Sequence, residues 1–319
     1  MELALFTNAL RQRPLTEALD LATSLGLGAV EVAVGGAATF PHLDAPDLLR
    51  KPAARRVLEA ELKSRGLRIC ALNCSGFPMH PEYGEAHTQA VEDALRLAHF
   101  LEVDTVVAMS GCPGDSPNSR TLNWIVCPWP TELAAVLGDQ WERAIEVWAE
   151  LADLAKKLGT RRIALELHPM QLAYNVPTLL RLRNAIGPII GANVDPSHLF
   201  WQQMDPVLVV RALGDLVCHV HLKDLEIRQA ACAIAGVLDT TSFSLPDERS
   251  WNFRTVGRGH GAEFWQNFLS ELRDVGYRGS LSVENEDPFQ TAEEGCCEAV
   301  LFMRDVLGTL GVGDTSYSE

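Results

Sequence analysis

One short stretch, the sequence HVHLKD at 219–224, constrains the fold of this chain more than any other. In an extended strand, successive side chains point to opposite faces, so one face here is apolar and the other carries two imidazoles and an ammonium. The apolar face suits packing against helices. The polar face needs partners, because burying such groups without hydrogen bonds or opposite charges costs free energy. The polar set is His219, His221 and Lys223, and the apolar set is Val220 and Leu222.

Three other segments alternate in the same way. The polar face carries Glu166 and His168 in the stretch 163–168, Asp195 in 193–195, and Glu284 in 281–286. Four strands in a row thus end with carboxylates or imidazoles pointing the same way. A closed parallel barrel explains this pattern, because its strands are covered by helices and converge on an active site at their C-terminal ends. The sequence therefore predicts an α/β protein with a (β/α)8 TIM barrel.

Strand-like and helix-like segments alternate eight times along the chain, with no composition shift that would mark a linker. We therefore predict one catalytic domain over residues 1–310, followed by a short flexible polar tail at 311–319. Two segments, 110–137 and 225–261, interrupt the rhythm after the fourth and seventh strands. Loops of this length in a compact domain are usually functional, so the first is either a substrate lid or a rigid surface flap, and both segments are expected to lie over the mouth of the active site.

Charge and composition exclude several classes of partner. The formal net charge is −15 and no basic run offsets it, so nucleic acid is not an expected partner. No apolar run is long enough to span a membrane, and the N-terminus resembles a first strand, not a signal peptide. The eight cysteines form no zinc or redox motif, which indicates reduced thiols and a cytoplasmic protein.

Four side chains at the ends of strands five to eight form a candidate metal site: Glu166, Asp195, His221 and Glu284. Neighbouring barrel strands lie about 4.8 Å apart, so these groups can converge on one ion. Three carboxylates and one imidazole suit Mn²⁺, Mg²⁺, Co²⁺ or Fe²⁺ better than a tetrahedral zinc ion. An octahedral ion would keep two positions for carbonyl and hydroxyl oxygens of a sugar. The alternative is a purely structural cluster of ion pairs.

The chemistry expected of such a site is proton abstraction beside a carbonyl, through a metal-stabilised enediolate. Either Glu166 or Glu284 removes the carbon-bound proton, and the other returns it. Return to the opposite face gives epimerisation, return to the neighbouring carbon gives isomerisation, and protonation of a leaving group gives β-elimination.

Further polar and aromatic residues are candidates for substrate binding. His198 and Lys223 are expected to hold hydroxyls or an oxyanion, and His168 is either a proton relay or a structural hydrogen-bonding group. In the long loops, Arg258 and His260 either bind a phosphate or carboxylate or lie in a solvated loop. An aromatic residue such as Trp124 would stack on a sugar or aglycone.

Several of these motifs together resemble the sugar phosphate isomerase/epimerase group of xylose isomerase-like TIM barrels. They are the segments 166–169, 193–198, 219–224, 257–260 and 282–284. The resemblance implies a Mn²⁺-type ion held by Glu166, Asp195, His221 and Glu284, and a substrate-binding role for His198. Related enzymes include ketose 3-epimerases, inosose dehydratases and the large subunits of C-glycoside deglycosidases.

Two positions depart from the ketose 3-epimerases, which carry a Glu where this chain has Leu172 and an Arg where it has Ile227. We therefore predict a metal-dependent sugar isomerase or epimerase, with a lyase acting on a 3-keto sugar, 3-keto glycoside or inosose as the alternative. A third possibility is a barrel that keeps its metal only as a structural support. The expected partners are a small carbohydrate or keto-sugar substrate and a second copy of the chain, or a small partner subunit if the protein is deglycosidase-like.

Overall fold

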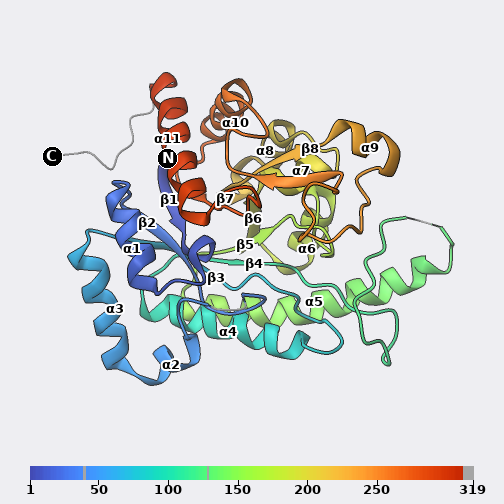
Figure 1. The fold of residues 1–319 in the computed structure, drawn as a ribbon. Helices are drawn as coiled ribbons and strands as arrows, with labels where there is room; N and C mark the ends of the chain where they lie inside the picture. Colours follow the sequence, from blue (N-terminus) through green and yellow to red (C-terminus); the bar gives the residue numbers. More distant parts are fainter. Residues whose placement is uncertain (39–40, 128, 312–319) are drawn as a thin grey trace.

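Eight parallel strands close into one barrel, in the order β1-β10-β7-β6-β5-β4-β3-β2, as Figure 1 shows. The computed structural model describes residues 1–38, 41–127 and 129–311. The predicted (β/α)8 fold is confirmed, while the predicted tail lies outside the described residues apart from Gly311. The barrel strands are β1 (Glu2–Phe6), β2 (Ala29–Ala33), β3 (Arg68–Asn73), β4 (Thr105–Ala108), β5 (Arg162–Glu166), β6 (Ile190–Val194), β7 (Val217–Leu222) and β10 (Ser280–Val283).

Helices surround the barrel and cover the outer faces of its strands (Figure 1). Several begin with the residues that favour helix starts. Asn175 and Thr178 form a capping box at the start of α6, and Thr291 and Glu294 form another at α11. The helices are α1 (Leu15–Ser24), α2 (Ala45–Arg50), α3 (Pro52–Ser64), α4 (Gly84–Phe100), α5 (Leu133–Leu158), α6 (Val176–Ile186), α7 (Pro196–Trp201), α8 (Pro206–Leu213), α9 (Gln229–Ala235), α10 (Ala262–Asp274) and α11 (Ala292–Thr309), with short 3-10 helices η1 (Thr7–Leu10) and η2 (Gly214–Leu216).

The two predicted interruptions differ from each other in structure. In the first, residues 110–127 and 129–132 are irregular, and α5 starts at Leu133, inside the segment expected to be a loop. The second contains α9 between two strands, β8 (Asp224–Ile227) and β9 (Trp251–Arg254), which pair in an antiparallel hairpin. Figure 1 shows this hairpin lying over the barrel beside α7.

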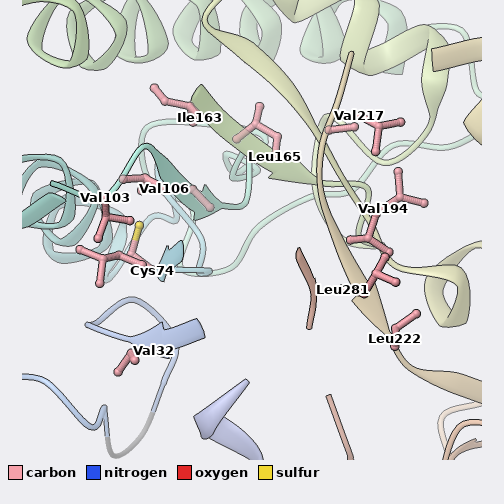
Figure 2. Packing of buried hydrophobic residues seen from close by; sticks show 14 of the residues in the cluster. Val32, Cys74, Val103, Val106, Ile163, Leu165, Val194, Val217, Leu222 and Leu281 are labelled. Atoms are coloured by element: carbon pink, nitrogen blue, oxygen red, sulfur yellow. The ribbon is translucent and has the colours of Figure 1, made fainter. Parts of the chain in front are cut away.

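The main hydrophobic core lies between the barrel and the helices. Outward-facing side chains of successive strands are fully buried there, including Val32, Val106, Ile163 and Leu281, which Figure 2 shows at close range. Their β-branched and leucine side chains fill the layer between strand and helix, as expected for strands covered by helices. Among the described residues, no helix combines the length and the apolar character needed to cross a membrane.

The inside of the barrel is unusually polar. Small side chains at Ala71, Val107 and Ala164 form a minor apolar cluster there. TIM barrel interiors are usually filled by Val, Ile and Leu, so a polar interior requires a fully paired hydrogen-bond network. Asn73, Glu31, His219 and Ser282 supply such a network below the C-terminal ends of the strands.

Candidate active site

The four side chains predicted as metal ligands come together at the C-terminal end of the barrel. Glu166, Asp195, His221 and Glu284 each offer a ligand atom, and these atoms all lie within 4.8 Å of one another. Each follows from strand parity: Glu166 ends β5, His221 lies on β7, and the other two directly follow β6 and β10. All four are buried. A single cation at their centre can therefore be reached by every one of them.

His221 is oriented by a residue that the sequence patterns did not single out, Glu31 on β2. His221 Nε2 lies 3.0 Å from Glu31 Oε1, while Nδ1 lies 3.0 Å from Glu284 Oε2 and 3.4 Å from Glu166 Oε1. One ring nitrogen thus faces a supporting carboxylate and the other faces the cluster. Histidines that bind metals are typically held in this way, because the supporting carboxylate fixes both the tautomer and the ring orientation.

Glu31 is itself completely buried and is held by three side chains. It lies 2.7 Å from His219 Nε2 and accepts a hydrogen bond from Asn73 Nδ2 at 2.8 Å. Burial raises the pKa of Glu31, but the contacts with His221 and His219 outweigh this and hold the pKa far below its usual range. The carboxylate therefore stays ionised beneath the candidate metal site.

The cluster carries more negative than positive charge, which favours binding of a cation. The buried Asp195 Oδ2 lies 3.1 Å from Lys223 Nζ, and the buried Glu284 Oε2 lies 3.0 Å from His221 Nδ1, but neither oxygen accepts a well-directed hydrogen bond from the described residues. Burial lowers the pKa of His221, but the charges of Glu31 and Glu284 raise it well above its usual range, so His221 and Lys223 are the two cations beside four buried carboxylates, including Glu31. Because burying anions in excess of cations is costly, a divalent cation would relieve the remaining negative charge. The residues present thus fit a hard, oxygen-preferring divalent ion.

Lys223, predicted to bind a hydroxyl or an oxyanion of the substrate, lies beside the cluster. Its Nζ is 3.1 Å from Asp195 Oδ2, 3.2 Å from Glu284 Oε1 and 3.2 Å from Glu286 Oε2. Burial lowers the pKa of Lys223, but the charges of Asp195 and Glu284 raise it well above its usual range. The ammonium therefore stays protonated and can donate to an oxygen at the cluster.

Two further predicted residues, His198 and His168, stand next to the carboxylates. His198 Nε2 lies 3.3 Å from Asp195 Oδ2 and 3.5 Å from Glu166 Oε1. The ring of His168 lies 4.0 Å from that of His198, and its Nδ1 contacts the carbonyl of Pro169. Burial and the neighbouring imidazole of His198 lower the pKa of His168 to about 3, so its ring is neutral.

Arg258 and His260 are placed away from the cluster, because Asp224 organises their loop. The buried Asp224 carboxylate accepts backbone N–H groups of Gly257, Gly259 and His260 at 2.9–3.0 Å and contacts His260 Nδ1 at 2.7 Å. A Cβ at Gly259 would collide with the backbone carbonyl of Leu225, so only glycine allows this close approach. The motif at 257–260 thus binds Asp224 and fixes the β8–β9 hairpin, to which Asp224 belongs.

The side chains of Arg258 and Trp124 find other partners. Arg258 makes a paired contact with Glu298 on α11, with Nε and one terminal nitrogen each 2.8 Å from a carboxylate oxygen. Trp124 packs edge-on against Tyr174 at 5.3 Å. Arg258, Trp124 and His260 are not among the described residues that line the large cavity over the cluster. The structure therefore does not bring these three predicted substrate-binding residues to the candidate site.

A cavity of about 1380 Å³ opens above the four-residue cluster. Its floor includes Glu166, His221 and Glu284, with His198 and Lys223 beside them. Loops after most of the barrel strands contribute to its wall, as do residues 239–243, Arg249 and residues 251–253 of the second interruption. Residues 110–127 and 129–137 of the first interruption do not line it.

Comparison with known proteins places this geometry in a family. Residues 19–306 match the family described as xylose isomerase-like TIM barrel. The chain belongs to this family. It is also 38% identical over 311 residues to the uncharacterised protein YfiH of Bacillus subtilis (strain 168), covering 96% of this chain and 99% of that protein. The family predicted from the sequence motifs is therefore confirmed.

Solved structures share the fold at low sequence identity. The IOLI protein with a bound zinc atom matches with a TM-score of 0.67 and 21% identity, covering 97% of this chain and 99% of that one. The probable 3-DHS dehydratase AsbF of Bacillus anthracis matches with a TM-score of 0.66 and 16% identity, covering 95% of this chain and 98% of that one. D-psicose 3-epimerase from Clostridium cellulolyticum H10 with D-tagatose matches with a TM-score of 0.64 and 14% identity, covering 96% of this chain and 99% of that one.

Proposed function

We propose that this protein is a divalent-metal-dependent sugar isomerase or epimerase that works by removing a proton next to a carbonyl group. The observation that carries the proposal is the convergence of Glu166, Asp195, His221 and Glu284 on one point at the floor of a large cavity. Mn²⁺ is the preferred ion, with Mg²⁺, Co²⁺ or Fe²⁺ as substitutes. The zinc atom bound to the IOLI protein, on the same fold, supports a divalent metal.

When bound by these four residues, a divalent cation supplies a Lewis acid that polarises a carbonyl and stabilises the developing negative charge. The chain's own carboxylates move the proton. Glu166 and Glu284 come from β5 and β10, which β6 and β7 separate around the barrel. They can therefore approach a sugar carbon from two sides, one removing the proton and the other returning it.

Neighbouring side chains hold the substrate in this scheme. Lys223 carries a permanent charge beside Asp195 and Glu284, which suits donation to a substrate hydroxyl or oxyanion. His198 contacts Glu166 at 3.5 Å, so it can orient that carboxylate or bind a second hydroxyl. Neutral His168 lies behind it, with ring centroids 4.0 Å apart, and can hold the orientation of His198.

A lyase that eliminates a group β to the carbonyl is the second candidate. Leu172 is buried and does not line the cavity, so the carboxylate that ketose 3-epimerases place there has no counterpart at this position. Glu286 instead places a half-exposed carboxylate on the cavity wall beside Lys223. Once this carboxylate has taken up a proton, it can give that proton to a leaving group. The probable dehydratase on the same fold supports this candidate.

Solvent-deuterium exchange tests the proposal. The Mn²⁺-loaded protein would be incubated in D₂O with ketoses, their phosphates, inososes and 3-keto glycosides, followed by mass spectrometry of substrate and product. We expect deuterium at one carbon beside the carbonyl, and loss of exchange in Glu166→Gln and Glu284→Gln. The matched control Glu298→Gln removes the same charge from a surface ion pair and should exchange normally. A product with a new double bond would identify the lyase, and absence of exchange in every substrate class would contradict the proposal.

A further inference from the structure

Four aromatic side chains line one side of the cavity: Trp201, Phe243, Trp251 and Phe253, here called the aromatic wall. The rings of Phe243 and Phe253 are parallel to within 6°, with centroids 6.3 Å apart. Trp251 lies 5.4 Å from Phe253, and Trp201 stacks on Trp251 at 5.4 Å. Each ring is thus held by its neighbours, and the wall presents a continuous aromatic surface.

The aromatic wall begins at the candidate active site. The Phe253 ring lies 5.6 Å from the ring of His198, and Lys223 Nζ lies 4.8 Å from its centroid. The wall therefore continues outward from the groups proposed to hold the sugar. The cavity volume of about 1380 Å³ also exceeds the roughly 300–1,000 Å³ typical of pockets for drug-sized ligands. A free monosaccharide would fill only its floor.

Phe243 is open to the cavity although it is firmly positioned. The Arg249 guanidinium packs over its ring, 3.9 Å from the centroid, and is itself buried. Phe243 nevertheless remains 62% exposed. Phe243 is thus the exposed part of a contiguous aromatic surface, and contiguous apolar patches that stay exposed are typical of binding sites.

Three polar side chains beside the aromatic wall already have partners within the chain. Arg249 Nε donates to the carbonyl of Trp251 at 3.2 Å, and Asn252 Nδ2 donates to the carbonyl of Pro246 at 2.9 Å. Asp239 accepts two backbone N–H groups at 2.8 and 2.7 Å. These three side chains are therefore not free to bind the hydroxyls of a second sugar ring, and the rings of the aromatic wall offer a flat apolar surface instead.

We propose that the aromatic wall binds a planar aromatic group joined to the sugar, the aglycone of an aryl glycoside. This inference rests on the proposed function, which places the sugar at the floor of the cavity. Stacking on Phe243 and Phe253 would hold the aglycone, while Lys223 and His198 hold the sugar.

Binding of three simple probes to the Mn²⁺-loaded protein tests this. Phenyl β-D-glucoside, methyl β-D-glucoside and cellobiose would be titrated by NMR. We expect the phenyl glucoside to bind about 3–10-fold more tightly than the methyl glucoside, the range that aromatic stacking supplies. Phe243→Ala should reduce this ratio to below about twofold, and Phe243→Trp should preserve it. Phe100→Ala is the matched control, because Phe100 is 49% exposed on α4 with Arg55 over its ring.

Three results would overturn the inference. The first is that the phenyl glucoside binds no more tightly than the methyl glucoside, or shows no saturable binding. The second is a preference for the phenyl glucoside that survives Phe243→Ala and Phe253→Ala. The third is tighter binding of cellobiose, which would assign the aromatic wall to a second sugar. The affinity ratio needs no turnover. Equal affinities for the phenyl and methyl glucosides would therefore contradict only the role of the aromatic wall. Failure of deuterium exchange would contradict only the proposed metal chemistry.

Discussion

Glu31→Gln should weaken metal binding although Glu31 is not one of the four proposed ligands. The Glu31 carboxylate accepts from Asn73 and contacts the Nε2 atoms of both His219 and His221, at 2.7 and 3.0 Å. A glutamine has the same shape but carries one oxygen acceptor and one NH₂ donor. One imidazole must then reverse its tautomer or lose its partner. If it is His221, the proton moves to Nδ1, the nitrogen that faces Glu166 and Glu284.

The size of the effect follows from the lost interaction. A hydrogen bond to a charged group contributes about 1.5–3 kcal/mol, and supporting carboxylates of metal-binding histidines are worth about 10–100-fold in metal affinity. We therefore expect the dissociation constant for Mn²⁺ to rise about 10–100-fold. Electron paramagnetic resonance of free Mn²⁺ would measure it, with circular dichroism to confirm folding and Glu298→Gln as the control. A dissociation constant within about threefold of the parent protein would refute the supporting role of Glu31.

Three further predictions concern other parts of the molecule. Glu166→Asp and Glu284→Asp keep the charge but retract the carboxylate, so they should retain much of the Mn²⁺ and lose about 10²-fold in deuterium exchange, since displacements near 1 Å can cost that much; full exchange in both would place the base elsewhere. Asp224→Ala leaves several buried N–H groups of the 257–260 loop unpaired, and should lower the free energy of unfolding by about 3 kcal/mol in urea titrations; an unchanged midpoint would contradict the anchoring role. Burial raises the pKa of Cys74 to about 12, so its protonated thiol should resist iodoacetamide in the native protein while exposed Cys127 reacts, as peptide mapping would show.

Local patterns in the sequence were sufficient to predict the barrel and the four-residue cluster. Alternating strand and helix segments define the repeating unit, and strand parity alone directs Glu166, Asp195, His221 and Glu284 inward. Barrel closure then brings the ends of neighbouring strands together. These features depend on short-range geometry, which a sequence records directly.

Features that depend on distant contacts were missed. Glu31 lies between Val30 and Val32 in a short apolar strand, and its partner His221 is 190 residues away along the chain. The only local signal was that Glu31 is a charged residue whose side chain faces the inside of the barrel from a buried strand. The β8–β9 hairpin also escaped prediction, because Asp224 pairs with Arg254 across an intervening helix. With the hairpin fixed, Asp224 holds His260 away from the cavity floor.

Glu166, Asp195, His221 and Glu284 are proposed to bind one divalent cation. Anomalous diffraction at the manganese edge, from crystals grown with Mn²⁺, would locate that ion. We expect one strong peak within coordination distance of all four side chains, with His221 Nδ1 as the imidazole ligand, and loss of that peak in His221→Ala. A manganese peak away from these residues, or no peak in a well-ordered crystal saturated with Mn²⁺, would contradict this proposal.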